Sequence, residues 1–223
     1  MTATATAVRP HALTVFDVAL DRAGAGRPVT LTLTDDRGTD HDLDPAGWCR
    51  DHLPGDRSLL ARCAGPTIDV GCGPGRITGA LNGRGHPALG IDISATAVRL
   101  ARARGATALR RDVFTPLPGH GRWRHLVLAD GNIGIGGDPA SLLRRCRELV
   151  DPSGNIHIEV AAPGTRSWAG IARLRAGTGI RSASFRWAVV AAGDVAAVAG
   201  AAGLRDRATW TEAGRWFTTL TPM

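Results

Sequence analysis

The sequence contains no lysine, no tyrosine and no long apolar run. All 27 basic residues are arginines, which excludes Schiff-base chemistry through a lysine side chain. No segment approaches the ~20 apolar residues that cross a bilayer, and Asp17 interrupts the short apolar stretch near the N-terminus. We therefore expect a soluble, cytoplasmic protein with no membrane partner.

Cysteine is scarce as well. The four cysteines show no CxxC spacing and no histidines paired with them, so neither a zinc site nor a disulfide framework is predicted. No cluster of carboxylates suggests a metal site either, and no metal is expected. The thiols are expected to be reduced and mostly buried, at Cys49, Cys63, Cys72 and Cys146.

The charge is strongly positive. A net charge of +7 and a pI near 10.9 raise the question of a nucleic-acid partner, because clustered cations bind phosphates by releasing counterions. Arginine, alanine and glycine are abundant together, however, which is typical of a genome-wide coding preference. Nucleic acid is therefore disfavoured as a partner, and the sequence leaves the oligomeric state open.

The length of 223 residues fits one α/β core with a modest extra segment. From about Pro66 onward, short apolar runs alternate with helical patterns, which is typical of βα units on a parallel sheet. Residues 1–65 are expected to form an N-terminal cap of helices and a hairpin. In the core we expect strands at 67–70, 86–92, 106–111, 125–129 and 155–160, helices at 76–82, 95–104 and from Asp138 to Val150, an Asp194-capped helix, and a hairpin of 204–211 with 215–220.

A glycine-rich turn follows the first of these strands. It reads Ile68-Asp69-Val70-Gly71-Cys72-Gly73-Pro74-Gly75. Glycines let the backbone turn sharply and approach a ligand closely, with the N–H groups of the next helix facing it. The GxGxG spacing, with an acidic residue two positions before the first glycine, differs from the GxGxxG that holds a dinucleotide pyrophosphate. The turn indicates a nucleotide-like ligand other than a dinucleotide.

Two acidic residues close the next two strands. Asp92 lies 21 positions after Gly71, close to the ~20-residue spacing at which a carboxylate meets ribose hydroxyls. Asp112 and Val113 end the third strand. Together with the glycine turn, this series resembles the cofactor motifs of class I (Rossmann-like) S-adenosylmethionine-dependent methyltransferases, from roughly Pro66 to the C-terminus.

The resemblance implies an α/β fold for residues 66–223. Its expected form is a seven-stranded, mostly parallel Rossmann-like methyltransferase sheet with helices on both faces and a C-terminal antiparallel hairpin. It also implies that S-adenosylmethionine is the cofactor, that S-adenosylhomocysteine is its product and that the acceptor is a small molecule. The cofactor contacts it implies are Asp69, Gly71, Gly73, Gly75, Asp92, Ile93, Asp112, Val113 and Asp130.

Two carboxylates are candidates for the chemistry. Asp130 lies in a glycine-rich loop after the fourth strand, which on the resemblance faces the methyl group and the acceptor, and Asn132 is a candidate acceptor contact. Glu159 lies near the end of the fifth strand, where open α/β sheets place ligands, so it is a candidate base. A structural role for the loop residues stays open, and His157 is interpreted as structural. The loop also lacks the motif of base-amine methyltransferases.

The segment 161–193 contains five arginines and no acidic residue. The resemblance implies that this segment covers the acceptor. Arginine binds carboxylate or phosphate through bidentate hydrogen bonds. Arg186 is the first candidate, because Phe185 and Trp187 flank it, and Arg181 is the second. A solvated, composition-driven surface is the alternative interpretation.

Three rival functions remain. An NAD-dependent reductase is disfavoured by the missing GxGxxG and by the absent tyrosine and lysine, on which many short-chain reductases rely. A nucleic-acid methyltransferase would use the basic surface, and a protein that binds the cofactor without catalysis is the third. We predict a methyltransferase that modifies a small, anionic metabolite.

Overall fold

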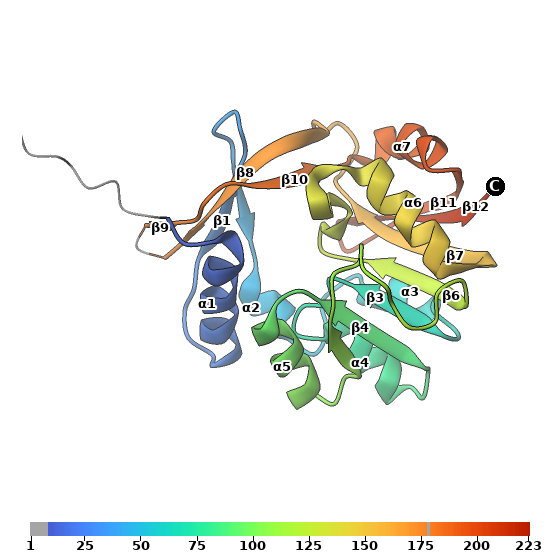
Figure 1. Ribbon diagram of the computed structural model, residues 1–223, viewed down its shortest axis with the longest axis horizontal. Helices are drawn as coiled ribbons and strands as arrows, with labels where there is room; N and C mark the ends of the chain where they lie inside the picture. The colour runs from blue at the N-terminus through green and yellow to red at the C-terminus, as the bar shows by residue number, and fades with distance from the viewer. Residues whose placement is uncertain (1–8, 178) are drawn as a thin grey trace, which may run out of the picture.

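The computed structural model describes residues 9–177 and 179–223, so the first eight residues of the expected cap lie outside it. Two sheets make up the described part, and Figure 1 shows them side by side. The larger sheet and its helices lie on the right of the view. The smaller sheet and α1 lie on the left, and two orange strands of the smaller sheet, within residues 168–189, run toward the larger sheet.

The larger sheet has seven strands in the order β11-β12-β7-β6-β3-β4-β5. β3 to β7 are parallel, and β12 and β11 add to one edge as an antiparallel hairpin. This confirms the fold expected from the sequence. The strands are β3 (Thr67–Val70), β4 (Ala88–Asp92), β5 (Ala108–Arg110), β6 (Trp123–Leu128), β7 (Val150–Val160), β11 (Leu204–Glu212) and β12 (Arg215–Pro222).

Apolar faces hold the helices against this sheet. In α6, Asp138 accepts from the N–H of Ser141, Pro139 takes the first position, and Leu142 and Leu143 are fully buried, as the sequence indicated. Asp194 takes the N-cap position of α7 as expected, but its side chain accepts from the Ser167 hydroxyl and makes no capping hydrogen bond to the helix. The helices are α3 (Asp56–Ala61), α4 (Arg76–Gly83), α5 (Ala95–Ala103), η1 (Asn132–Gly137), α6 (Pro139–Leu149), η2 (Ala192–Asp194) and α7 (Val195–Ala201).

The smaller sheet combines two segments that are distant in the sequence. Its strands are antiparallel, in the order β10-β8-β1-β2, with β9 beside β8. Leu33 pairs with Leu174 in the register of β1 and β8, and both are buried. The elements are α1 (Ala12–Gly24), β1 (Leu31–Thr34), β2 (Asp40–Leu43), α2 (Pro45–Trp48), β8 (Trp168–Ala176), β9 (Ile180–Arg181) and β10 (Phe185–Val189).

The sequence analysis treated the N-terminal cap and the segment 161–193 as separate covers, without strands in the second. Their joint sheet was missed because β8 alternates mainly alanine, glycine and arginine, which gives little apolar contrast. Pairing of β1 with β8 is also non-local. The two segments therefore form one structural layer, which packs on the larger sheet through α1 against α5 and through β10 against η1.

The close contact of β10 with η1 explains why this loop is rich in glycine. A Cβ at Gly134 would lie 2.8 Å from the indole nitrogen of Trp187, and one at Gly137 would lie 2.7 Å from the Cβ of Arg186. Both glycines are therefore required for β10 to approach. No helix in the described residues is long and apolar enough to cross a membrane.

Candidate functional site

A cavity of about 430 Å³ lies between the two sheets. On one side it is lined by the ends of β3 and β4 and by the residues that follow β6, and on the other by α1, α2, β8 and β10. Parallel strands leave such a crevice at their carboxyl ends where the strand order reverses, and here β3 has β4 on one side and β6 on the other. The volume suits small molecules.

The glycine turn forms the floor of this cavity. Gly71, Gly73 and Gly75 have φ angles of 73°, 53° and 83°, a region that side chains rarely adopt. Their surroundings differ. A Cβ at Gly75 would lie 2.7 Å from that of Ala101, whereas a Cβ at Gly73 would meet nothing within 4 Å. Gly75 thus allows α4 to pack on α5, and Gly73 borders open space in the cavity.

Asp92 ends β4 beside that turn and lines the cavity. One carboxylate oxygen accepts from the N–H of Gly73 at 3.0 Å, and the other accepts from the N–H of Ser94 at 2.8 Å. Burial raises the pKa of Asp92, and these two backbone hydrogen bonds oppose the shift. Asp92 therefore holds the glycine turn while presenting a carboxylate edge to the cavity.

Next to Asp92, apolar side chains stand exposed inside the cavity. Ile93 is 50% exposed and Phe114 is 47% exposed, although most large apolar residues here are buried. Asp112 and the buried Val113 also line the cavity, and the carboxylate of Asp112 accepts from the N–H of Phe114 at 2.9 Å. An apolar slot edged by a carboxylate fits a flat heterocycle that carries an amino group.

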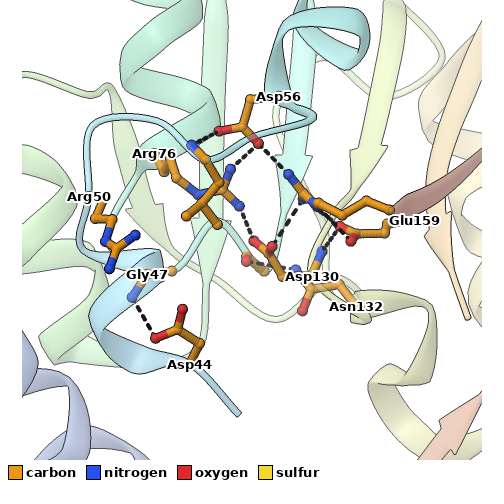
Figure 2. Close-up of polar contacts among 12 residues, drawn as sticks. Asp44, Gly47, Arg50, Asp56, Arg76, Asp130, Asn132 and Glu159 are labelled. Atoms are coloured by element: carbon orange, nitrogen blue, oxygen red, sulfur yellow. Dashed lines mark hydrogen bonds and ion pairs between the residues drawn. The ribbon is translucent and has the colours of Figure 1, made fainter. Parts of the chain in front are cut away.

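A network of charged side chains borders the cavity next to the glycine turn, as Figure 2 shows. The guanidinium of Arg76 donates to the carboxylates of Asp56 and Asp130. Arg215 donates to Asp56 at 2.7 Å, to Asp130 at 3.2 Å, and to both oxygens of Glu159 at 2.9 and 2.7 Å. Three carboxylates thus share two guanidinium groups, and of the five side chains only those of Arg76 and Asp130 line the cavity.

Asp130 is held in an unusual conformation by this network. Its φ of 54° is rare for a residue other than glycine, and its N–H donates to Glu159 at 2.6 Å. Burial raises the pKa of Asp130, while Arg76 opposes the shift. The carboxylate is thereby fixed at the cavity wall.

Arg76 carries a second feature that points to a ligand. It is 3% exposed, and its Nε has no hydrogen-bond partner among the described residues. A buried donor without a partner is costly. Because Arg76 lines the cavity beside Asp69 and Asp130, a ligand that brings both a carboxylate and an ammonium group there would fit the donor and acceptor set.

Comparisons with known proteins agree with this geometry. A family model described as a methyltransferase domain matches residues 68–154. The matched residues include the glycine turn, Asp92, Asp112 and Asp130. Among curated proteins, a ubiquinone biosynthesis O-methyltransferase of Yersinia enterocolitica is 25% identical over 107 residues, which cover 45% of this chain and 44% of that relative. The match thus spans less than half of the relative's length.

Solved structures share the fold over more of the chain. An S-adenosylmethionine-dependent methyltransferase from Bacteroides fragilis, in complex with S-adenosyl-L-homocysteine, is 20% identical, with a TM-score of 0.77 over 97% of this chain and 98% of that one. A 1,6-didemethyltoxoflavin-N1-methyltransferase from Burkholderia thailandensis is 16% identical, with a TM-score of 0.53 over 75% of this chain and 74% of that one.

The candidate base Glu159 and the candidate acceptor contact Asn132 differ in whether they line the cavity. Glu159 does not line the cavity, because Arg215 and the N–H of Asp130 engage its oxygens. Asn132 lines it, but its amide group donates to the carbonyls of Val70 and Gly71 at 3.1 and 2.8 Å. Direct roles for Glu159 and Asn132 stay predictions. The geometry favours a supporting role for both.

The structure also separates the arginines of the segment 161–193. Arg186, on β10, lines the cavity and makes no ion pair within the described part of the chain. Arg181 lines a separate surface groove with Arg173 and Arg175, of which the last pairs with Asp40. Arg181 does not line the cavity, and its expected role at the acceptor stays a prediction.

His157 is held as a structural residue. Its Nε2 lies 3.1 Å from Nδ1 of His125, and its Nδ1 lies 3.0 Å from the hydroxyl of Thr219. Burial lowers the pKa of His157 to about 3, so the ring is neutral at neutral pH. The sequence analysis missed three members of the network. Asp56 and Arg215 reach it only through tertiary packing. Arg76 could have been found from the sequence, because it directly follows Gly75, the last glycine of the turn.

Proposed function

We propose that this protein transfers a methyl group from S-adenosylmethionine to a small molecule that carries an anionic group. The observation that carries the proposal is that one cavity joins the glycine turn and Asp92 at one end to an apolar chamber with an unpaired arginine at the other. On this proposal, residues 66–160 and 194–223 hold the cofactor. The described residues of the N-terminal cap, 9–65, and the segment 161–193 together enclose the acceptor.

The residues present fit the cofactor. Asp92 would meet the ribose hydroxyls, Ile93 and Phe114 would contact the faces of the adenine, and Asp112 would accept from its amino group. Asp69 and Arg76 would meet the amino and carboxylate groups of the methionine end. When bound, S-adenosylmethionine supplies an electrophilic methyl group on a sulfonium, which the acceptor attacks in line.

Asp130 and Glu159 are proposed to act on the charge and position of the reacting groups. Asp130 presents a carboxylate at the cavity wall, where it would stabilise positive charge. Glu159 holds the backbone of Asp130 in its rare conformation and neutralises part of the charge on Arg215. An acceptor that must lose a proton would release it to Asp130 or to solvent.

Arg186 is proposed to receive the anionic group of the acceptor. Its Cβ is packed against Gly137, which fixes where the side chain begins. Alignment of the acceptor with the methyl group supplies much of the rate in such a displacement. A two-pronged contact from Arg186 would provide this alignment.

Calorimetry with S-adenosylhomocysteine and with NAD tests the cofactor. Binding of the first and no binding of the second is expected, and the reverse would refute the proposal. Labelled S-adenosylmethionine incubated with a pool of metabolites would then identify the acceptor by its labelled product.

A substitution tests the role of Arg186 on that acceptor. Arg186→Met should lower kcat/KM by about tenfold to a few hundredfold, as expected for a lost charge-assisted hydrogen bond. Arg173→Met, in the same segment but in the separate groove, is the matched control. An uncharged acceptor, or equal kinetics of the two variants, would contradict the anionic assignment.

A further inference from the structure

The acceptor end of the cavity is lined by a distinctive set of side chains. Apart from Arg186 and His11, they are all apolar, and they come from α1, β1, β2, α2, β8 and β10. Within residues 9–177 and 179–223, no serine, threonine, asparagine or glutamine lines this end, so hydroxyl and amide groups of a ligand would find few partners among these residues. The apolar members are Ala12, Leu13, Phe16, Leu33, Leu43, Trp48, Leu174, Phe185 and Trp187.

Aromatic residues are concentrated on this cavity. The whole chain has only 4 phenylalanines, 6 tryptophans and no tyrosine. Half of these ten line the one cavity, namely Phe16, Trp48, Phe114, Phe185 and Trp187. In a chain with so few aromatic residues, this concentration is not explained by composition.

Four of these rings form two walls at the acceptor end. Phe16 and Trp48 lie with ring centroids 5.8 Å apart at 41°, and Phe185 and Trp187 lie 6.1 Å apart at 65°. All four are only partly buried, so part of their apolar surface stays uncovered. Covering aromatic surface with another ring, by stacking or edge contact, is favourable beyond the area buried.

The wall that carries Trp187 is also held rigidly. The indole of Trp187 packs on Gly134, and the backbone of β10 follows η1 closely enough that Gly137 admits no side chain. A wall that is already in place binds a ligand without an ordering cost. The same contact fixes where the side chain of Arg186 begins, and Arg186 lines the same cavity.

We propose that the methyl acceptor is a planar aromatic compound with a single oxyanion, which is held between the aromatic walls while Arg186 meets the oxyanion. This inference rests on the proposed function, because it names the class of molecule in the same cavity. A sugar or a peptide is excluded as the main body of the acceptor, since its hydroxyl or amide groups would be stripped of water without new partners. The oxyanion is a carboxylate or a phenolate.

Binding of simple probes to the full-length protein tests the inference without turnover. The protein is saturated with S-adenosylhomocysteine and titrated by calorimetry with 2-naphthoate, 2-naphtholate at alkaline pH, decahydro-2-naphthoate and glucuronate. We expect the aromatic probes to bind about tenfold more tightly than the saturated one, and glucuronate to show no binding. The first two probes separate a carboxylate from a phenolate.

Two variants locate the probe. Trp187→Leu should weaken naphthoate binding about fivefold to tenfold and leave the affinity for S-adenosylhomocysteine within about twofold. Trp210→Leu is the matched control, because Trp210 stacks on Phe217 outside the cavity and should leave naphthoate binding unchanged. If Trp187→Leu loses S-adenosylhomocysteine binding through misfolding, Phe16→Leu on the opposite wall takes its place.

The outcomes separate the two proposals. Failure of the wild-type protein to bind S-adenosylhomocysteine contradicts the proposed function. Normal binding of S-adenosylhomocysteine with naphthoate no tighter than decahydronaphthoate, or with no effect of either wall variant, overturns the aromatic assignment alone.

Discussion

The two ends of the cavity are shaped by different interactions. At the cofactor end, the shape comes from backbone: three glycines at positive φ, two N–H groups held by Asp92, and a buried ion network. At the acceptor end, it comes from side chains on a small sheet whose strands lie far apart in the sequence. Backbone geometry restricts the residue types at the first end, whereas apolar walls tolerate exchange at the second.

This difference indicates where change is tolerated. Apolar residues of similar volume replace one another at modest loss, so the acceptor end can be altered to suit a new ligand. A buried ion network or a glycine at positive φ has few substitutes. Substitutions at the two ends should therefore differ in kind: cofactor-end changes disturb folding or cofactor binding, and acceptor-end changes alter the choice of acceptor.

The largest effect is expected at the ion network. Arg215→Leu leaves Asp56 and Asp130 with Arg76 alone and removes the ion pair of Glu159. It should lower the free energy of unfolding by about 3 to 5 kcal/mol at pH 8. Urea denaturation of both proteins measures the loss. Arg57→Leu, at a side chain that is 90% exposed and pairs only loosely with Glu212, should change stability by less than about 0.5 kcal/mol.

The loss should shrink as the pH falls. In the native protein, burial raises the pKa of Asp56, but hydrogen bonds and charge from Arg76 and Arg215 and the N–H of Leu53 outweigh it, so the pKa is lowered. The ionised Asp56 therefore stabilises the fold at pH values above its unfolded pKa of about 3.8. This contribution is lost as the pH falls through the lower pKa of the folded protein. Without Arg215 the carboxylates of the folded variant bind protons more readily, which relieves their repulsion. A deficit that is equal at pH 8 and pH 3 would contradict this account of the network.

The next largest effect concerns the open space beside the glycine turn. Gly73→Val places a branched side chain where the cofactor would lie, and should weaken S-adenosylhomocysteine binding at least about 100-fold, or 2.7 kcal/mol. Gly85→Val is the matched control, because Gly85 also has positive φ, at 77°, and open surroundings, but lies outside the cavity. Both should lose roughly 1 to 2 kcal/mol of stability through backbone strain, and comparable loss of affinity in both would mean that the ligand lies elsewhere.

A smaller effect is expected at Asp92. Asp92→Ala removes one carboxylate from the cofactor end and should weaken S-adenosylhomocysteine binding by about 1 to 3 kcal/mol, measured by calorimetry. Asp151→Ala removes a similar carboxylate, which accepts from the N–H of Ser153 near the start of β7 and outside the cavity, and should leave the affinity unchanged. Unchanged affinity in a folded Asp92→Ala protein would remove Asp92 from the proposed ribose contact.

What the sequence determined by itself was the cofactor half. The alternation of strands and helices, the glycine turn, Asp92, and the Asp138-Pro139 start of α6 are local patterns, because each depends on residues within one βα unit. The observed bounds of β5 and β7 differ by a few residues from those expected from the sequence, because the ends of strands depend on hydrogen bonds to neighbouring strands.

What only the tertiary structure decided was the other half. The pairing of β1 with β8 and the joining of Asp56 and Arg215 to Asp130 bring together residues distant in the chain. Packing also decided that Arg186 lines the cavity while Arg181 lies in a separate groove. No local period records such pairings, because they follow from which strand edges and faces meet once the sheets pack. The acceptor cavity is therefore a property of the folded molecule.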